Sequence, residues 1–432
     1  MAIIAQKSLF VWEDDINSLG DLERLRLVME SIPDEELMGK LEASRGRGRN
    51  DYPVRAMWNL VLAGRVFEHS EDASLLRELR RNRQLAYVCG FEFRRLPEAH
   101  NLSRFRKLLL KFQGDVDAML HRMNEELYSV LEGYGEELAM DSKWVKSAAG
   151  RRSKRKRPDG RSESDARLGK KAYSGVREDG SKWEKTVSCF GFKIHLLVDA
   201  VHELPIAYEV TDAAASDITE GRKLLERLAE ERSGVLETCH HLMGDRGYDD
   251  GKLIGFLKGM GVKAVIDKRV MRRGEPESAV PGYPDAYYDE HGNVYCYEPQ
   301  SGARHLMTPN GYESGRDALR FKCPAQAYGI HCSDIGHCRC RNIRVPLATD
   351  PRIFTQVQRE SHKWKRLYRM RTSVERVNSR LDMAFGFEEN RTRGLARTKQ
   401  KVSLSLLTML GMALGRIRLG HPERIRSHFK AA

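Results

Sequence analysis

The chain has 432 residues, with 74 Lys and Arg against 61 Asp and Glu, so its net charge is +13. A hydrophobic content of 41% is typical of a folded globular protein, and the basic excess favours a polyanionic partner such as nucleic acid. The longest apolar stretch, residues 402–414, is too short to span a bilayer, and no signal-peptide pattern is visible. These features argue against a membrane or secreted protein and predict a cytoplasmic one with reduced cysteines.

The first part of the chain, residues 1–132, repeats apolar side chains at the three- and four-residue spacing of amphipathic helices. Asp21, Asp72 and Ser103 stand at or near the expected N-caps. The segment after Ser103 predicts a basic helix, whose candidate DNA-binding residues are Arg104, Arg106 and Lys107. We expect an all-α domain whose basic faces either bind DNA or lie in solvent.

Residues 133–268 predict three strands, a helix, a strand, a helix and a final strand. The first strand, at 138–146, carries Asp141, and the fourth strand ends at Asp245. The helix between them begins at Ser216 or Asp217. This order of elements indicates an α/β core with an aspartate at the end of each of two strands.

The densest basic run of the chain, residues 151–161, follows the first strand. It contains Pro and Gly and has no apolar periodicity, so it predicts a loop. A nuclear-localisation signal is one interpretation, and neutralisation of DNA phosphates beside Asp141 is the other. The candidate DNA-binding residues of this loop are Arg151, Arg152, Lys154, Arg155, Lys156 and Arg157.

Residues 269–350 change in character and predict a small β-rich segment, because they are rich in Pro, Gly and Tyr and contain hairpin signals. Four cysteines lie at its end, at Cys323, Cys332, Cys338 and Cys340. Their spacing is not that of a paired C-x2-C knuckle. Two hypotheses therefore stay open, a structural Zn²⁺ site and a set of reduced packing cysteines.

Residues 351–432 include a predicted helix from Tyr368 to Asp382. Tyr368, Arg371 and Glu375 are spaced i, i+3 and i+7, so they share one face of this helix. One interpretation is a solvated helix with an ordinary ion pair. The other is a carboxylate cluster of Glu375 with Asp141 and Asp245, whose hard oxygen ligands suit Mg²⁺ or Mn²⁺.

These motifs together resemble the insertion-sequence DDE transposases, in the group whose third-acid helix carries a Tyr-x2-Arg-x3-Glu-x6-Lys signature. Tyr368, Arg371 and Glu375 match the spacing of that signature, and DRGYDD, which begins at Asp245, is similar to the context of the second acid. The Lys of the signature falls on Asp382, and Arg380 is the candidate replacement.

The resemblance implies an α/β RNase H-like core at 133–268 and 351–432, a β-rich insertion at 269–350 and an all-α DNA-binding domain at 1–132. It implies strand cleavage and strand transfer by Asp141, Asp245 and Glu375 with two Mg²⁺ ions, while Arg371 and Tyr368 support the site. The implied partners are the element's terminal inverted repeats and target DNA, bound by a homodimer in a bacterial-type, nucleoid-associated synaptic complex.

Two other functions stay open at this point. A nuclease or resolvase of the same fold would cleave DNA without transposition. A catalytically inert DNA-binding protein derived from a transposase would need no metal, and Asp382 at the position of the signature lysine is the feature of the sequence that favours it.

Overall fold

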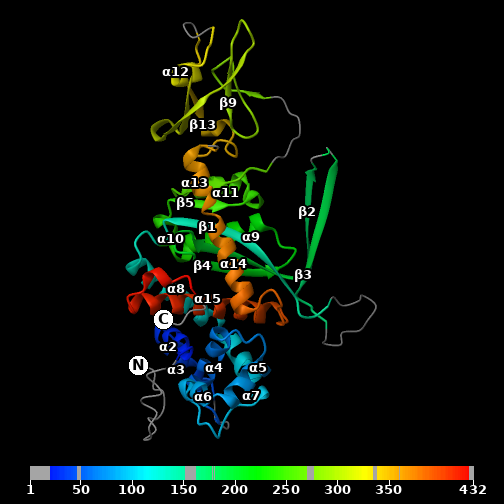
Figure 1. Ribbon diagram of the computed structural model, residues 1–432, viewed down its shortest axis with the longest axis vertical. Coiled ribbons are helices and arrows are strands. Elements are labelled where there is room, and N and C mark those ends of the chain that lie inside the picture. Colours follow the sequence, from blue (N-terminus) through cyan, green and yellow to red (C-terminus); the bar gives the residue numbers. More distant parts are fainter. Residues whose placement is uncertain are drawn as a thin grey trace.

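The structure, a computed structural model, describes residues 20–45, 50–150, 162–177, 179, 181–269, 277–333, 338–359 and 361–427. The predicted DNA-binding residues of the basic loop, Arg151, Arg152, Lys154, Arg155, Lys156 and Arg157, lie outside these ranges. The molecule is elongated, with the N-terminal helices at one end, a large sheet in the middle and two small sheets at the other end (Figure 1). No helix in the described ranges is long and apolar enough to cross a membrane.

The predicted N-terminal helical region is confirmed. Its helices are α2 (Leu22–Ser31), α3 (Glu35–Ala43), α4 (Val54–Val66), α5 (Asp72–Arg81), α6 (Arg83–Cys89), α7 (Ala99–Leu109) and α8 (Gln113–Val130), with the 3₁₀ turn η1 (Leu110–Phe112) before α8. The basic helix α7 begins four residues before the expected cap at Ser103. Its start is fixed by a capping box, in which the Glu98 N–H donates to Asn101 Oδ1 at 3.0 Å.

A mixed sheet forms the middle of the molecule. Its strands are β1 (Glu137–Lys146), β2 (Arg167–Val176), β3 (Lys182–Asp199), β4 (Leu204–Asp212), β5 (His241–Gly244) and β6 (Lys263–Ile266). Strand β3 is antiparallel to β1, β2 and β4, whereas β5 runs parallel to both β1 and β6. The strand order is β2-β3-β1-β5-β6. Strand β4 also pairs with β3, on the edge opposite β1. The sequence predicted all of these strands except β2.

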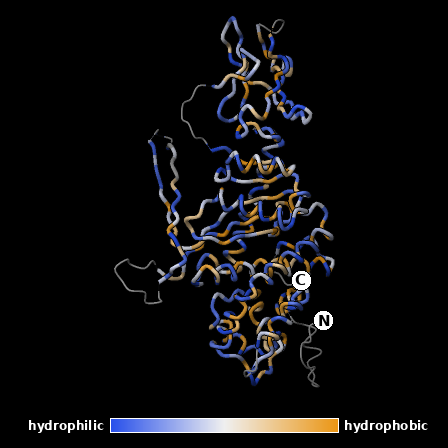
Figure 2. Tube along the Cα trace, turned by 180° about the vertical axis from the view of Figure 1, so that it is seen from behind, coloured by the Kyte–Doolittle hydropathy of each residue, from blue (hydrophilic) through white to orange (hydrophobic). Residues whose placement is uncertain are grey.

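The 18-residue strand β3 has two halves with different partners. Its second half lies between β1 and β4 in the core, and its first half pairs only with β2, so that the two strands extend from the sheet as an arm. Most side chains of β3 between Lys182 and Ser188 are exposed. Figure 2 shows hydrophilic residues along the outer part of this arm. Strand β2 has no regular apolar alternation because it has no core to cover, which is why the sequence did not reveal it.

Helices pack against the sheet and join it to the N-terminal region. They are α9 (Asp217–Glu231), α10 (Ser233–Thr238), α11 (Gly251–Gly259), α13 (His362–Arg369), α14 (Thr372–Phe385) and α15 (Leu395–Arg418), followed by the 3₁₀ turn η5 (Pro422–Arg424). Helix α14 packs on β1 and β3, and α15 packs on α2, α8 and β4. One buried apolar cluster therefore runs from the N-terminal helices through the sheet to α15.

The predicted helix from Tyr368 to Asp382 is wrong in one respect, because the chain forms two helices there. Helix α13 ends at Arg369 and α14 begins at Thr372. At the junction the N–H groups of Arg371 and Val374 donate to carbonyls three residues earlier, as in a 3₁₀ turn. Arg371 therefore stands at the N-cap of α14, at the tightened turn between the two helices.

The segment between Asp245 and Glu375 contains the two small sheets. One has the order β10-β9-β8-β7, and the other the order β11-β12-β13. Their elements are β7 (Ser278–Ala279), β8 (Ala286–Tyr288), β9 (Val294–Tyr297), β10 (Arg304–Leu306), β11 (Thr308–Glu313), η3 (Ser314–Arg316), β12 (Ala318–Lys322), α12 (Pro324–Tyr328), β13 (Asn342–Pro346) and η4 (Leu347–Thr349). The two sheets share an apolar cluster that is separate from the main core.

Candidate catalytic and nucleic-acid-binding site

The two predicted strand-end aspartates are neighbours in the central sheet. Strands β1 and β5 are parallel, and Met140 is opposite Gly244. Asp141 and Asp245 each follow one member of this pair, so both lie at the same edge of the sheet. Burial and the charge of Asp245 raise the pKa of Asp141 to about 6, although the charges of Lys171 and Arg371 oppose this shift.

The DRGY motif holds Asp245 in a specific orientation. Asp245 is the N-cap of the 3₁₀ turn η2 (Arg246–Tyr248), and its Oδ1 accepts the Gly247 N–H at 2.8 Å. A Cβ at Gly247 would lie only 2.7 Å from this oxygen, so a larger residue at this position would displace the Asp245 carboxylate. Tyr248, the last residue of the turn, is buried. The motif thus fixes the second carboxylate at the sheet edge.

The third predicted acid, Glu375, forms an ion pair with Arg371, whose charge also affects Asp141 at the sheet edge. Arg371 Nη1 lies 2.7 Å from Glu375 Oε1, and the charge of Arg371 acts on Asp141. The Arg371 guanidinium lies 5.6 Å from the centre of the Tyr368 ring, which stacks on Trp364 with centroids 4.6 Å apart. Glu375 and Tyr368 thus lie beside Arg371, and the charge of Arg371 reaches Asp141 at the sheet edge.

The oxygen atoms of the three carboxylates are not close enough together to be ligands of one metal ion as they stand. In the described ranges, the only group of three His, Cys, Asp or Glu whose donor atoms all lie within 4.8 Å of one another is elsewhere, in the β-rich insertion. The Glu375 side chain is 51% exposed and directed to Arg371. In this position Glu375 pairs with Arg371 and is not grouped with the two aspartates.

The position of the signature lysine has an unexpected partner. Asp382 Oδ2 lies 2.5 Å from Nζ of Lys143, on strand β1. Lys143 is two residues after Asp141, and therefore on the same face of the strand. Arg380 does not take the place of the lysine, because it donates to the backbone carbonyl of Glu203 in the β3–β4 turn. The lysine beside this position of the helix thus belongs to β1 and not to the helix itself.

We expect the Lys143–Asp382 pair to couple β1 to α14. Both side chains are mostly buried, at 19% and 25% exposed, so Lys143→Met leaves a carboxylate with little solvation and should lower the free energy of unfolding by about 1–2 kcal/mol. The double variant Lys143→Met, Asp382→Leu should recover part of that loss. Urea unfolding of both single variants and the double variant measures the coupling, and strictly additive effects would contradict it.

A fourth carboxylate, Asp217, was expected from the sequence only as a helix cap. Its Oδ1 accepts hydrogen bonds from Ser142 Oγ and Lys193 Nζ, both at 2.8 Å, and Lys171 Nζ lies 3.6 Å from its Oδ2. Burial raises the pKa of Asp217, but the hydrogen bonds and the two lysine charges lower it by more. Because Ser142 follows Asp141, this network adjoins the sheet-edge acids, and no motif in the sequence signals it.

A second candidate site lies where the N-terminal helices meet the start of α15. A cavity of about 380 Å³ is lined there by seven basic side chains and by two acids, Glu71 and Asp72. We call this cavity the basic groove, and its cations are Arg65, Arg106, Lys107, Arg391, Arg393, Arg397 and Lys401. It brings two of the predicted DNA-binding residues of α7 together with cations from the other end of the chain, while the exposed Arg104 does not line it.

The electrostatics of the basic groove favour an anion. Burial lowers the pKa of Lys401 to about 7, and repulsion by Arg65 contributes to this shift. Burial likewise lowers the pKa of Arg65 to about 9, with repulsion by Arg106 as a further cause. A phosphate in the groove would offset both effects, because it would stabilise the charged forms of these side chains.

The predicted zinc ligands need a correction. Cys323, Cys332 and Cys338 line one small cavity of the insertion, but Cys340 does not, since it is fully buried in the apolar cluster of the insertion. The fourth sulfur at the cavity belongs to Cys296, on β9. The sequence did not point to Cys296 because it lies 27 residues before the next cysteine and reaches the others only through strand pairing.

Comparison with known proteins identifies the family. The family description "Transposase DDE domain" matches residues 138–410, and "Transposase domain (DUF772)" matches residues 11–108. Among solved structures, a piggyBac transposase synaptic complex with hairpin DNA is similar over 96% of this chain and 80% of that chain. The sequence identity is 11% and the TM-score is 0.34, which is too low to establish a common fold. No curated protein matches. Since the first description covers more than half of the sequence, the chain belongs to the DDE transposases.

Proposed function

We propose that this transposase cleaves DNA at the ends of an insertion sequence and joins the freed 3′ ends to target DNA, with Asp141, Asp245 and Glu375 as the catalytic acids. The observation that carries this assignment is the pair of aspartates at neighbouring ends of the parallel strands β1 and β5. The central sheet has three consecutive antiparallel strands, β1, β3 and β4, and two further parallel strands, β5 and β6, beside β1. This order supports an RNase H-like core.

The residues of the site fit a hard divalent cation. All three donors are carboxylates, which suit Mg²⁺ or Mn²⁺ better than Zn²⁺. Burial and repulsion by Asp245 together raise the pKa of Asp141, and a bound cation would offset both effects because it stabilises the charged carboxylates. Two bound ions would supply an activated water and stabilise the leaving oxygen of a phosphodiester.

The chain's own residues then bind and orient the DNA strand. Asp141 and Asp245 would hold the cations at the sheet edge, and the exposed Glu375 would be the third ligand once it turns from Arg371. Arg371 can then bind a phosphate oxygen pair with its guanidinium, and Tyr368, held by Trp364, keeps Arg371 in place. Double-stranded DNA extends from the site towards the basic groove, and two chains pair the two ends in a homodimeric complex.

The pH dependence of stability tests the raised pKa of Asp141, which burial and the charge of Asp245 cause together. In metal-free protein the raised pKa of Asp141 means that folding favours the protonated form, so stability falls as the pH rises from 3.8 through about 6. Asp141→Asn should therefore stabilise the metal-free protein by about 2–3 kcal/mol at neutral pH. This gain should vanish as the pH approaches 3.8. Thermal unfolding with a chelator, across this pH range, measures this gain, and an unchanged or lower stability of Asp141→Asn at neutral pH would contradict the raised pKa of Asp141.

A strand-transfer assay tests the proposed reaction. The inverted repeats that flank the gene define the donor DNA, and the full-length protein is incubated with this donor, a target plasmid and Mg²⁺ or Mn²⁺. Cleavage at the repeat ends and covalent joining to the plasmid support the proposal. Cleavage without joining would indicate a nuclease of the same fold. Specific binding without any cleavage under either metal would indicate a catalytically inert protein.

A further inference from the structure

The cavity in the β-rich insertion collects four cysteines from three separate parts of the sequence. Cys296 lies on β9, Cys323 directly follows β12, and Cys332 and Cys338 come from the segment between α12 and β13. All eight cysteines of the chain are described, and each carries a thiol rather than a disulfide. The cavity measures about 10 Å³, roughly the room that one water-sized particle needs.

We propose that this cavity binds one structural zinc ion through the thiolates of Cys296, Cys323, Cys332 and Cys338. Four cysteine sulfurs are a common ligand set of structural zinc, and thiolates are poor ligands for Mg²⁺. The site is therefore chemically separate from the carboxylate site of the central sheet. No three of these four sulfurs lie within 4.8 Å of one another, so binding would draw them inwards to about 2.3 Å from the ion.

Neighbouring polar groups already hold two of the sulfurs in position. The N–H of Cys340 donates to Cys338 Sγ at 3.1 Å, and this kind of backbone donor stabilises a metal-bound thiolate. Ser333, next to Cys332, donates to Glu298 through its hydroxyl at 2.6 Å and through its backbone N–H at 3.3 Å. Glu298 thus ties the chain at Cys332 to the end of β9.

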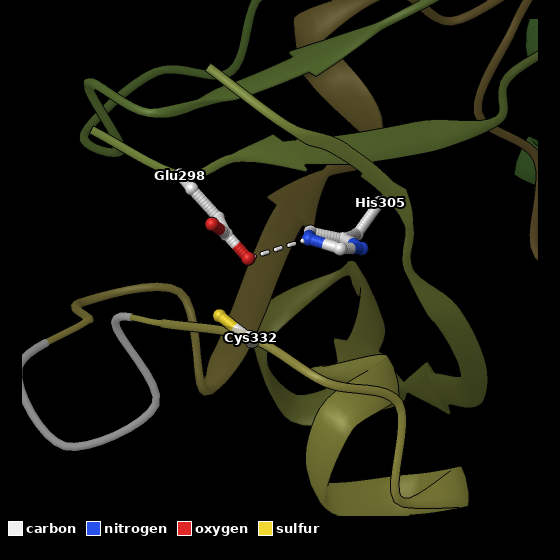
Figure 3. A group of neighbouring side chains, drawn as sticks. All are labelled: Glu298, His305 and Cys332. Carbon is white, nitrogen blue, oxygen red and sulfur yellow. Dashed lines mark hydrogen bonds and ion pairs between the residues drawn. The ribbon is translucent and has the colours of Figure 1, made fainter. Parts of the chain in front are cut away.

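Glu298 and His305 face Cys332 closely enough to be ligands themselves (Figure 3). However, His305 Nε2 is 2.9 Å from Glu298 Oε1, and the carboxylate also accepts hydrogen bonds from Ser301 and Ser333. Metal binding by either side chain would break this network. We therefore assign Glu298 and His305 a supporting position outside the ligand set.

A zinc ion at this place would connect the two small sheets. Cys296 belongs to the four-stranded sheet and Cys323 follows the central strand of the three-stranded sheet. The sheets share a small apolar cluster that is separate from the main core of the molecule. A module of this size buries little apolar surface, and structural metals commonly stabilise such modules. The zinc would thus fix the insertion as one unit on the catalytic core.

Metal analysis of the full-length protein, purified without added zinc, tests the proposal. We expect about one zinc per chain in the wild type. Cys296→Ser and Cys338→Ser should each reduce bound zinc at least about tenfold. Cys189→Ala is the matched control, because it removes a buried thiol on β3 of the central sheet that does not line the cavity, and it should keep the zinc.

Thiol alkylation of the wild type provides a second readout that does not depend on the folding of a variant. Mass spectrometry should show Cys296, Cys323, Cys332 and Cys338 protected together, and all four should become reactive after zinc is removed by a chelator. A wild type without zinc, with the four thiols equally reactive before and after the chelator, would overturn the proposal. Zinc kept by Cys296→Ser but lost from His305→Ala would also overturn it, in favour of the Glu298, His305 and Cys332 group.

Discussion

Asp245→Asn is expected to abolish Mg²⁺-dependent DNA cleavage while leaving DNA binding unchanged. The substitution keeps the size of the side chain and the acceptor oxygen for the Gly247 N–H, so the turn after β5 should stay folded. It removes the negative charge that, with Asp141, would hold the metal ions. Loss of groups that only support a metal ligand costs about 10–100-fold in activity, so loss of a ligand should exceed about 100-fold.

Asp250→Asn is the matched control for this prediction. Asp250 lies five residues further along the chain and caps α11, with its Oδ2 accepting the Leu253 N–H at 2.9 Å. Asparagine caps a helix as well as aspartate does, so this variant should cleave DNA at the wild-type rate. Cleavage of end-labelled donor DNA and electrophoretic binding assays measure both properties. If the Asp245→Asn variant cleaved DNA at the wild-type rate, Asp245 would not be a catalytic residue.

The second large effect is expected in the basic groove. Lys107→Gln, Arg391→Gln and Arg397→Gln together remove three of its cations. If each contacts a phosphate, the slope of log K against log salt concentration should become shallower by about 2.7, since each contact on duplex DNA contributes about 0.9. Binding should weaken on all DNA sequences alike, because phosphate contacts carry no base information.

A triple variant with the same change in charge, but outside the groove, separates contact from overall charge. Arg26, Arg122 and Lys223 are well exposed and lie on α2, α8 and α9. Their replacement by Gln should change the salt slope much less. Equal slopes for the two triple variants would show that the groove does not contact DNA and that the net charge alone controls binding. The loop at 151–157 can be tested in the same way.

Much of the fold could be predicted because its strands and helices carry clear periodic patterns. The pattern around Asp141 and Asp245 placed both aspartates at strand ends, and the parallel pairing of β1 with β5 then makes them neighbours. Strand β2 escaped prediction because an exposed ribbon needs no apolar alternation. The break at Arg371 also escaped, since every residue near it is an acceptable helix former and the tight turn depends on tertiary packing.

The parts of the candidate sites that could not be predicted are contacts between distant segments. Lys143 and Asp382 form an ion pair although they are 239 positions apart in the sequence. Cys296 and Cys332 line the same cavity because the two small sheets pack against each other. The basic groove combines α7 with the start of α15 in the same way. A single sequence reports local periodicity and spacing, but such pairs depend on how complete elements pack, so their residue types alone gave no signal.

The position of α15 has a consequence for how the protein is made. This helix, Leu395–Arg418, packs on α2 and α8, although it is synthesised long after them. The N-terminal helices therefore cannot complete their hydrophobic core until α15 has been made, and the most distant contacts must form last. A transcript truncated before residue 395 should yield an aggregation-prone chain rather than a separate DNA-binding fragment. Only a polypeptide that includes α15 can therefore assemble the basic groove.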